Sequence, residues 1–364
     1  MHGPGCEADA PAAAQQIDAG ASGHPTLDRA LLTALLTRPR IALLILLAVA
    51  LALPTVADWM GEPFYVRLAT RILVFALAAV SLDLILGFGG MVSFGHAAFV
   101  GIGGYAVGIL FAHQSDGSTL FGFPGTVNGL IVWPLAMLAG ALAALPVGAI
   151  SLRTTGVPFI MITLAFAQML FYLMTGLKAY GGDDGIALWS RSTLPGPLNI
   201  TDHTTFYYVV LGLLVAALAL GWRLVNSRFG RVIRGAKDNE RRMAALGYPV
   251  TRYKLAAFVI AGALAGLAGA LLANATMFVG PQYLHWSRSG DLIVMVVLGG
   301  IGTLIGPVLG AAALLLLEEF VPELMDLAHA GLGEHWKIVL GPVLILLVLY
   351  ARKGLWGVVA GRRP

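Results

Sequence analysis

The chain has 364 residues, of which 58% are hydrophobic and only 12% are charged. Soluble domains carry about 25% charged residues, so the composition excludes an ordinary soluble protein and indicates one that lies in a membrane. The net charge of +4 then indicates basic cytoplasmic loops rather than nucleic-acid binding. The single cysteine, Cys6, excludes an intrachain disulfide. The His, Asp and Glu residues show no metal-ligand spacing, so we expect no metal site.

The first 37 residues are rich in Ala, Gly and Pro and predict a disordered cytoplasmic tail, residues 1–37. An apolar run follows Arg38 and Arg40 and could belong to a signal peptide. That run begins some forty residues into the chain, which is late for a signal peptide and favours a retained first helix.

The apolar segments predict an all-α fold, a polytopic helical membrane protein with about eight full spans plus a re-entrant pair of half-helices. A β-barrel would alternate apolar and polar residues, and these segments do not. The segments fall at about 41–56, 66–86, 96–112, 130–150, 157–177, 206–224, 255–278, 292–300, 303–317 and 336–350. We expect one transmembrane domain over 38–356, followed by a basic tail over 357–364.

Loop charge predicts the orientation, because Lys and Arg are retained on the cytoplasmic side. Residues 223–254 hold nine Lys and Arg against Asp238 and Glu240, so this loop is placed inside. If 292–317 were a single span, the acidic loop over 318–334 would face inward and the basic C-terminal tail outward. A break at the glycines near 300 reverses both assignments, so we expect two half-helices there and both termini in the cytoplasm.

Two glycine-rich stretches interrupt the apolar pattern, "LGFGGMVSFGHAAF" from residue 86 and "LGGIGTLIGP" from residue 298. Non-helical backbone at membrane depth survives only where protein or a water-filled cavity satisfies it. Paired interruptions in two halves of a membrane protein indicate a transport site, and here a possible inverted repeat. The candidate pathway residues are Gly89, Gly90, Ser93, Gly95, His96, Gly299, Gly300, Gly302 and Thr303.

Residues 225–250 form a basic cytoplasmic segment with an intermittent helical period. Asp238 or Asn239 can cap a short second helix of about eight residues, and Gly247 followed by Pro249 ends it. Such a segment could rest on anionic lipid. The acidic turn "KDNE" and the small residues "AALG" favour docking into a protein groove instead.

Five stretches in order resemble the branched-chain amino-acid ABC transporter permease family of the LivM type: "LGFGGMVSFGHAAFVGIGGYAVGIL", "ISLRTTGVPFIMITLAFAQM", "YGGDDGI", "RGAKDNERRMAALGYPVTRYK" and "VVLGGIGTLIGPVLGA". The resemblance covers roughly 41–355. It implies that the basic segment docks on a soluble ATPase. The residues that match the coupling motif are Arg234, Asp238, Asn239, Glu240, Ala244, Ala245 and Gly247.

The resemblance also implies the partners: ABC ATPase subunits, a second LivH-type permease and a periplasmic or extracellular binding protein, in a bacterial inner membrane. No Walker A sequence occurs in this chain, so a partner must bind the ATP and we expect no cofactor here. The loop "YGGDDGI", with Gly182, Asp183 and Asp184, could contact the binding protein or form a solvated turn.

Other polar residues have structural interpretations beside functional ones. His96 could serve the pathway or bond a carbonyl of the broken helix. Asp83 is expected at an interface or with a buried partner, Glu318 and Glu319 in solvent, and Gln168 and Asn274 in interhelical hydrogen bonds.

The leading hypothesis is therefore a permease subunit, not an enzyme, that imports branched-chain or related hydrophobic amino acids. An ion-coupled secondary transporter is the alternative, but it needs an ionisable relay across the membrane, and Asp83 and His96 make a poor one. A membrane enzyme would need a convergent catalytic set, which the sequence does not show. Amides, urea and aromatic acids remain open as substrates.

Overall fold

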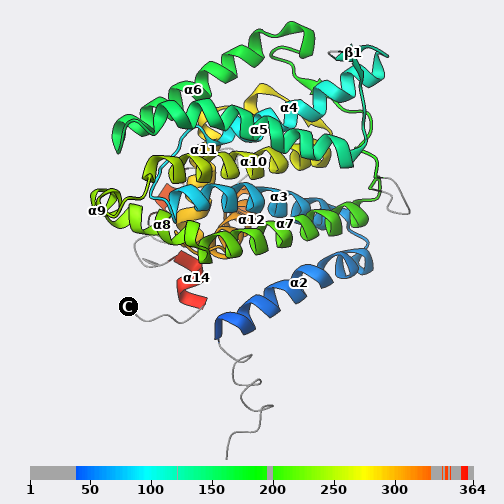
Figure 1. Cartoon of the computed structure of the whole chain (residues 1–364). Coiled ribbons are helices and arrows are strands. Elements are labelled where there is room, and N and C mark those ends of the chain that lie inside the picture. Colours follow the sequence, from blue (N-terminus) through cyan, green and yellow to red (C-terminus); the bar gives the residue numbers. More distant parts are fainter. Residues whose placement is uncertain are drawn as a thin grey trace, which may run out of the picture.

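The computed structural model describes residues 38–120, 122–194, 200–328 and 354–359, with residues 338, 341, 342 and 345. The predicted tail 1–37 and most of the predicted segment 336–350 lie outside these residues, as do residues 360–364. Within them the fold is almost wholly helical (Figure 1). The helices are α2 Arg38–Met60, α3 Pro63–Leu86, α4 His96–Ser115, α5 Gly129–Ser151, α6 Val157–Gly176, α7 His203–Asn226, α8 Arg228–Asp238, α9 Glu240–Ala245, α10 Val250–Thr276, α11 Trp286–Gly299, α12 Gly306–Ala328 and α14 Gly354–Val359.

Seven helices among the described residues are long and apolar enough to cross a membrane, namely α2, α3, α4, α5, α6, α7 and α10. The expected polytopic helical architecture is therefore confirmed. The predicted retained helix after Arg38 is α2. The predicted count of about eight spans included segment 336–350, which the described residues do not test.

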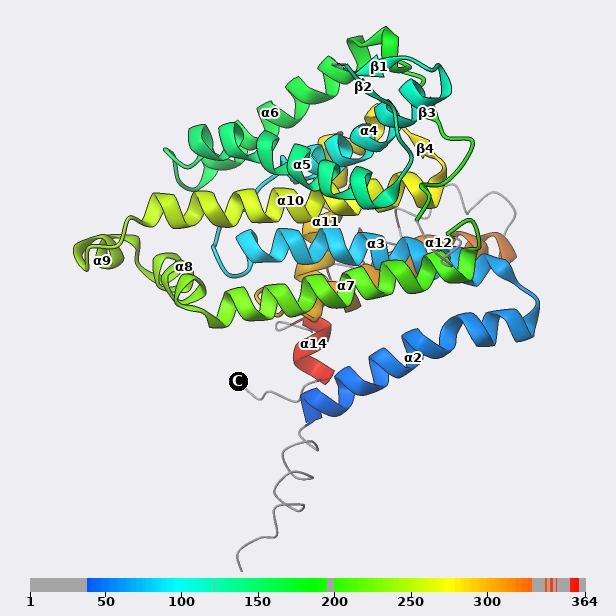
Figure 2. The same ribbon diagram turned by 45° about the vertical axis from the view of Figure 1, so that its right-hand side comes forward.

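The two ends of the bundle differ in structure. Helices α3, α5, α7 and α10 run roughly side by side, with α8 and α9 beyond one end (Figures 1 and 2). The opposite end carries two short antiparallel pairs, β1 Thr119–Leu120 with β2 Phe123–Pro124, and β3 Ile186–Ala187 with β4 Phe278–Val279. The 3₁₀ turns Lys178–Tyr180 and Pro281–Tyr283 complete the connections. We refer to these as the α8–α9 end and the strand end.

The core lies on α3, α4 and α10, which are buried along most of their length, whereas α2, α5, α6 and α7 expose much of their apolar surface. Helices that are apolar all round belong inside a bundle or in lipid. Glycines let α10 approach its neighbours, since a Cβ on Gly266 would meet the Ala136 carbonyl of α5 and one on Gly103 of α4 would meet Gly266. Small residues at these positions therefore let the helix backbones pack closely.

At the edge of the molecule, α2 is held to α7 through the backbone of α2 (Figure 2). Pro54 lies inside α2 and has no N–H to donate to the carbonyl of Ala50, four residues earlier. The Tyr207 hydroxyl of α7 donates to that carbonyl at 2.7 Å. The neighbouring Tyr208 hydroxyl donates to the Leu51 carbonyl at 3.1 Å. Tyr207 of α7 thus supplies the hydrogen bond that the Ala50 carbonyl lacks because of Pro54.

The predicted break near residue 300 is confirmed, because α11 ends at Gly299 and α12 begins at Gly306. The two arms are unequal. Helix α11 has 14 residues, whereas α12 has 23 and continues well past the predicted end at 317. The chain turns at the α8–α9 end, beside the last turn of α3, and α12 then runs back toward the strand end. It is a long helix rather than the expected half-helix.

Candidate functional site

The basic segment predicted over 225–250 forms two short helices, α8 and α9, that meet at an extended residue, Asn239. The Asn239 side chain accepts a hydrogen bond from the Arg242 N–H at 2.9 Å. Of the two caps left open by the sequence, Asn239 is the one that forms, while Asp238 ends α8. Gly247 follows with φ +85°, a left-handed conformation that suits glycine. The second helix has six residues rather than about eight.

The last turn of α9 is exposed and carries small or apolar residues. Ala244, Ala245 and Gly247 are all exposed, and so is Leu246, at 66% of its maximum. Burial of a leucine side chain against another protein is favourable, because it removes apolar surface from water. Exposed apolar residues on a capped helix therefore indicate a contact surface. We call these four residues the α9 tip.

Other residues of the predicted coupling set hold the segment against the bundle. Glu240 pairs with Lys254 of α10, with 2.6 Å between Oε2 and Nζ. The Arg234 guanidinium donates to the Val225 carbonyl at 3.0 Å. The structure therefore divides the set: Arg234, Asn239 and Glu240 support the segment from within, while the α9 tip faces outward.

A junction joins this segment to both glycine-rich interruptions. The Lys237 ammonium of α8 donates to the Gly87 carbonyl at 2.7 Å, where α3 gives way to the first interruption. One turn earlier, the buried Asp83 accepts a hydrogen bond from the Gly302 N–H of the second interruption at 2.8 Å. A Cβ on Gly87 would meet both Asp83 and the Gly302 backbone. We call Asp83, Gly87, Lys237 and Gly302 the junction.

The first interruption, residues 87–95, lines a cavity of about 290 Å³ at the α8–α9 end. Gly89 and Gly90 lie on one side, and Lys237, Glu240 and Lys254 on another. We call it the glycine cavity. Its walls include Lys237 of α8 and Glu240 of α9, so any movement of these helices changes the cavity directly.

Farther along the same interruption, the residues are buried in the bundle. Ser93 and His96 are fully buried, and Gly95 packs against the Thr163 backbone of α6. His96 Nε2 lies 2.8 Å from the Ser81 hydroxyl of α3. The sequence left open a bond from His96 to a carbonyl of the broken helix; the observed partner is the Ser81 hydroxyl instead. Ser81 also donates to the Ala78 carbonyl, which leaves its oxygen to accept from His96.

The second interruption is a packed turn, and its residues do not line the glycine cavity. Gly300 and Gly302 have positive φ, and the Thr303 hydroxyl donates to the Gly300 carbonyl at 2.6 Å. A Cβ on Gly299 would meet the Gly306 carbonyl, and one on Gly354 would meet Gly300. Close packing explains these glycines without a solute.

At the strand end, the loop proposed to contact a binding protein has two kinds of residue. Asp183 and Asp184 are exposed, whereas Gly182 is buried and has φ +51°. Gly182 therefore shapes the turn and the two carboxylates face outward.

A buried arginine, Arg191, holds this end together. Its guanidinium donates to the carbonyls of Asn274, Ile200 and Thr201, and it lies over the Phe206 ring. Burial lowers the pKa of Arg191 from its ordinary value, and Asp202 opposes that change. The Asn274 side chain accepts from the Ser192 N–H of the loop at 2.7 Å and donates to the Ala270 carbonyl of its own helix, so the expected bond between helices is replaced by one between α10 and the loop.

Comparison with known proteins identifies the family. Residues 64–349 match the model of the branched-chain amino acid transport system / permease component family. The chain belongs to this family of permeases. No solved structure matches it.

Named relatives agree with this assignment. The permease is 27% identical over 344 residues to the high-affinity branched-chain amino acid transport system permease protein LivM of Salmonella typhimurium, covering 87% of this chain and 75% of that one. LivM of Escherichia coli is 26% identical with the same coverage. The LivH permease of Salmonella typhimurium is 25% identical over 292 residues, covering 76% of this chain and 88% of LivH.

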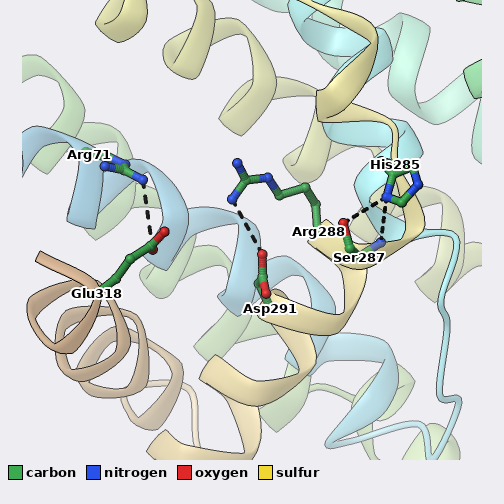
Figure 3. Close-up of polar contacts among 6 residues, drawn as sticks. All are labelled: Arg71, His285, Ser287, Arg288, Asp291 and Glu318. Carbon is green, nitrogen blue, oxygen red and sulfur yellow. Dashed lines mark hydrogen bonds and ion pairs between the residues drawn. The ribbon is translucent and has the colours of Figure 1, made fainter. Parts of the chain in front are cut away.

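Sequence reasoning missed three basic residues of the permease. Lys237 was counted only as loop charge. Arg71 and Arg288 received no role, although Arg71 lies within the apolar helix α3 and Arg288 in the first turn of α11 (Figure 3). Arg71 lies beside Glu318 and Glu319 of α12, at 3.9 and 4.0 Å, so these two glutamates are not simply solvated as expected. For Arg71, an ionisable residue within an apolar run was the available signal.

Proposed function

We propose that this permease is the membrane subunit of an ABC importer that brings branched-chain or related hydrophobic amino acids into the cytoplasm. The α9 tip carries the proposal, because a short capped helix with exposed small residues suits a groove on a soluble ATPase. The names of the relatives support the substrate class.

The charge of the α8–α9 end supports the orientation. The nine Lys and Arg of residues 223–254 favour the cytoplasmic side, so the strand end faces the periplasm or the exterior of a bacterial inner membrane. Helix α2 starts on the α8–α9 side and runs toward the strand end, in keeping with an N-terminus inside (Figure 2). The C-terminal tail is proposed to lie inside as well.

Partners follow from the same arrangement. The α9 tip is offered to an ATPase that binds the ATP, and Asp183 and Asp184 to a substrate-binding protein at the strand end. A second LivH-type permease would complete the membrane part. The junction gives movement of the coupling segment a route to both interruptions, since Lys237 bonds the first and Asp83 joins the first to the second.

Reconstitution of the assembled transporter in proteoliposomes tests the proposal. With ATP inside, the binding protein outside and no ion gradient, we expect uptake of leucine, isoleucine or valine. Uptake that requires a proton or sodium gradient would favour the ion-coupled alternative instead.

A paired substitution tests the α9 tip. Ala245→Asp places a carboxylate on the docking face, where an unpartnered buried charge costs at least a few kcal/mol. We expect substrate-stimulated ATP hydrolysis to fall at least about tenfold while the permease still inserts. Thr251→Asp is the matched control, because Thr251 is exposed in the first turn of α10 at the same end. If Ala245→Asp couples like the control, α9 does not dock on the ATPase.

A further inference from the structure

A second cavity, of about 250 Å³, lies among α3, α4, α10 and α11. Its lining includes two arginines, Arg71 of α3 and Arg288 of α11, together with apolar side chains such as Phe75, Leu272 and Leu292. We call it the arginine recess. We infer that the arginine recess binds the transported solute, a small zwitterion with an apolar side chain, by its carboxylate; the inference rests on the proposed function.

The depth of the arginines is the first argument. Arg71 lies eight residues past Pro63, roughly 12 Å along α3 at 1.5 Å per residue. A charge at that depth in a hydrocarbon layer about 30 Å thick must face protein or water rather than lipid. The Arg71 side chain is 37% exposed, and the Arg288 side chain is 40% exposed. Exposed guanidinium groups on membrane helices therefore indicate a polar route.

The ion pairs of both arginines are loose. Arg71 lies 3.9 Å from Glu318 and 4.0 Å from Glu319, and Arg288 lies 3.5 Å from Asp291 (Figure 3). Charge-assisted hydrogen bonds of N–H groups to carboxylates are shorter, about 2.7–2.9 Å. A zwitterion can therefore approach with its carboxylate toward the two guanidinium groups, which line the recess and are not tightly held by their own acidic partners.

The N-terminus of α4 adds to the attraction. Ala97, in the first turn of this 20-residue helix, also lines the recess. Helix N-termini carry partial positive charge and favour anions. The Ala97 N–H itself is used by the Ser289 hydroxyl at 3.0 Å, so the contribution is the field of the helix rather than a free donor.

The remaining wall suits an aliphatic side chain. Phe75, Leu272 and Leu292 offer apolar surface, and burial of such surface stabilises a bound leucine-sized group. The volume lies just below the range of about 300–1,000 Å³ typical of ligand pockets, so the occupant is small. One charged pole and one apolar wall together describe an aliphatic amino acid better than urea or a simple amide.

Three variants in the assembled transporter test the inference. Arg71→Gln and Arg288→Gln should each lower ATP-driven leucine uptake about tenfold, as expected for loss of a charged hydrogen bond, while assembly and basal ATP hydrolysis stay near wild type. Arg71→Lys should restore part of the uptake, because it keeps the charge. Arg67→Gln is the matched control: Arg67 is exposed one turn earlier on α3 and does not line the recess.

A photoreactive diazirine analogue of leucine gives a direct readout. It should label peptides that contain Phe75, Leu272 or Leu292, and the label should fall in Arg71→Gln but not in Arg67→Gln. If wild type imports leucine while both glutamine variants match the control, or if the label lies elsewhere, the recess is not the binding site. If the variants fail to assemble with a second permease, the arginines serve a subunit interface, and the inference is wrong. Failure of wild type to import any amino acid would instead defeat the proposed function.

Discussion

The two glycine-rich interruptions look alike in sequence and do different work in the structure. The first, residues 87–95, is open backbone that lines the glycine cavity with Gly89 and Gly90. The second, residues 300–305, is a tight turn in which glycines let backbone meet backbone. A run of glycines thus indicates that the backbone at that point must be free of side chains. The surroundings decide whether that backbone faces a cavity or another segment of the same chain.

The largest expected effect contrasts the two interruptions directly. Gly299→Ala places a methyl group against the Gly306 carbonyl, and because backbone cannot yield, we expect destabilisation of about 1–3 kcal/mol or more and a marked loss of assembled complex. Gly90→Ala meets the flexible Lys237 side chain at 3.0 Å, and its φ of +68° adds about 1–2 kcal/mol of strain. It should assemble, with impaired transport. Yield after size-exclusion chromatography and thermal stability would measure the contrast, and equal yields would contradict it.

A smaller effect is expected where the coupling segment meets the first interruption. Lys237→Met keeps the apolar stem of the side chain but removes the ammonium that donates to the Gly87 carbonyl, so movement of α8 should reach the interruption less well. We expect the amount of leucine imported per ATP hydrolysed to fall roughly threefold to tenfold. Arg231→Met on the exposed surface of α8 is the control. A normal ratio in Lys237→Met would mean that the junction does not transmit the movement.

The smallest effect is expected at the two buried ionisable groups. Asp83→Asn keeps an oxygen that can accept from the Gly302 N–H, and His96→Gln keeps a polar group within reach of Ser81. Uptake driven by ATP without an ion gradient should stay within about twofold of wild type, because each change leaves its hydrogen bond possible. Loss of uptake in Asp83→Asn with normal assembly would instead point to proton coupling.

Much of the fold could be predicted because apolar length and loop charge act locally. The apolar extent of most helices and the Asn239 cap depend on residues within one or two turns of each other, and the break after Gly299 follows from its glycines together with the charge of the loops beyond it. The junction could not be predicted in the same way. Lys237 reaches Gly87, and Asp83 reaches Gly302, across 150 and 219 residues, and such pairs follow from the packing of α3, α8 and α12.

The candidate site shows the same limit. Ala244, Ala245 and Gly247 were selected by resemblance, and the structure leaves them exposed as a docking surface requires, but their role is still a prediction. Gly299 and Gly300 were selected as pathway residues by their resemblance to the first interruption; the structure shows them closely packed, and their pathway role is still a prediction. Arg71 was overlooked because it is a single charge in a long apolar helix whose acidic partners lie on α12, and Arg288 because its partner Asp291, three residues later on the same helix, makes it look like a local surface pair.

The proline of α2 has a consequence for the order in which the protein is made. Synthesis delivers α2 to the membrane before α7, since chains emerge from their N-terminus. Until α7 arrives, the Ala50 carbonyl beside Pro54 has no helical partner, and its donor, Tyr207, lies 157 residues later. The hydrogen bonding of α2 is therefore completed only after α7 has been made, although α2 also packs on α3, the helix that follows it.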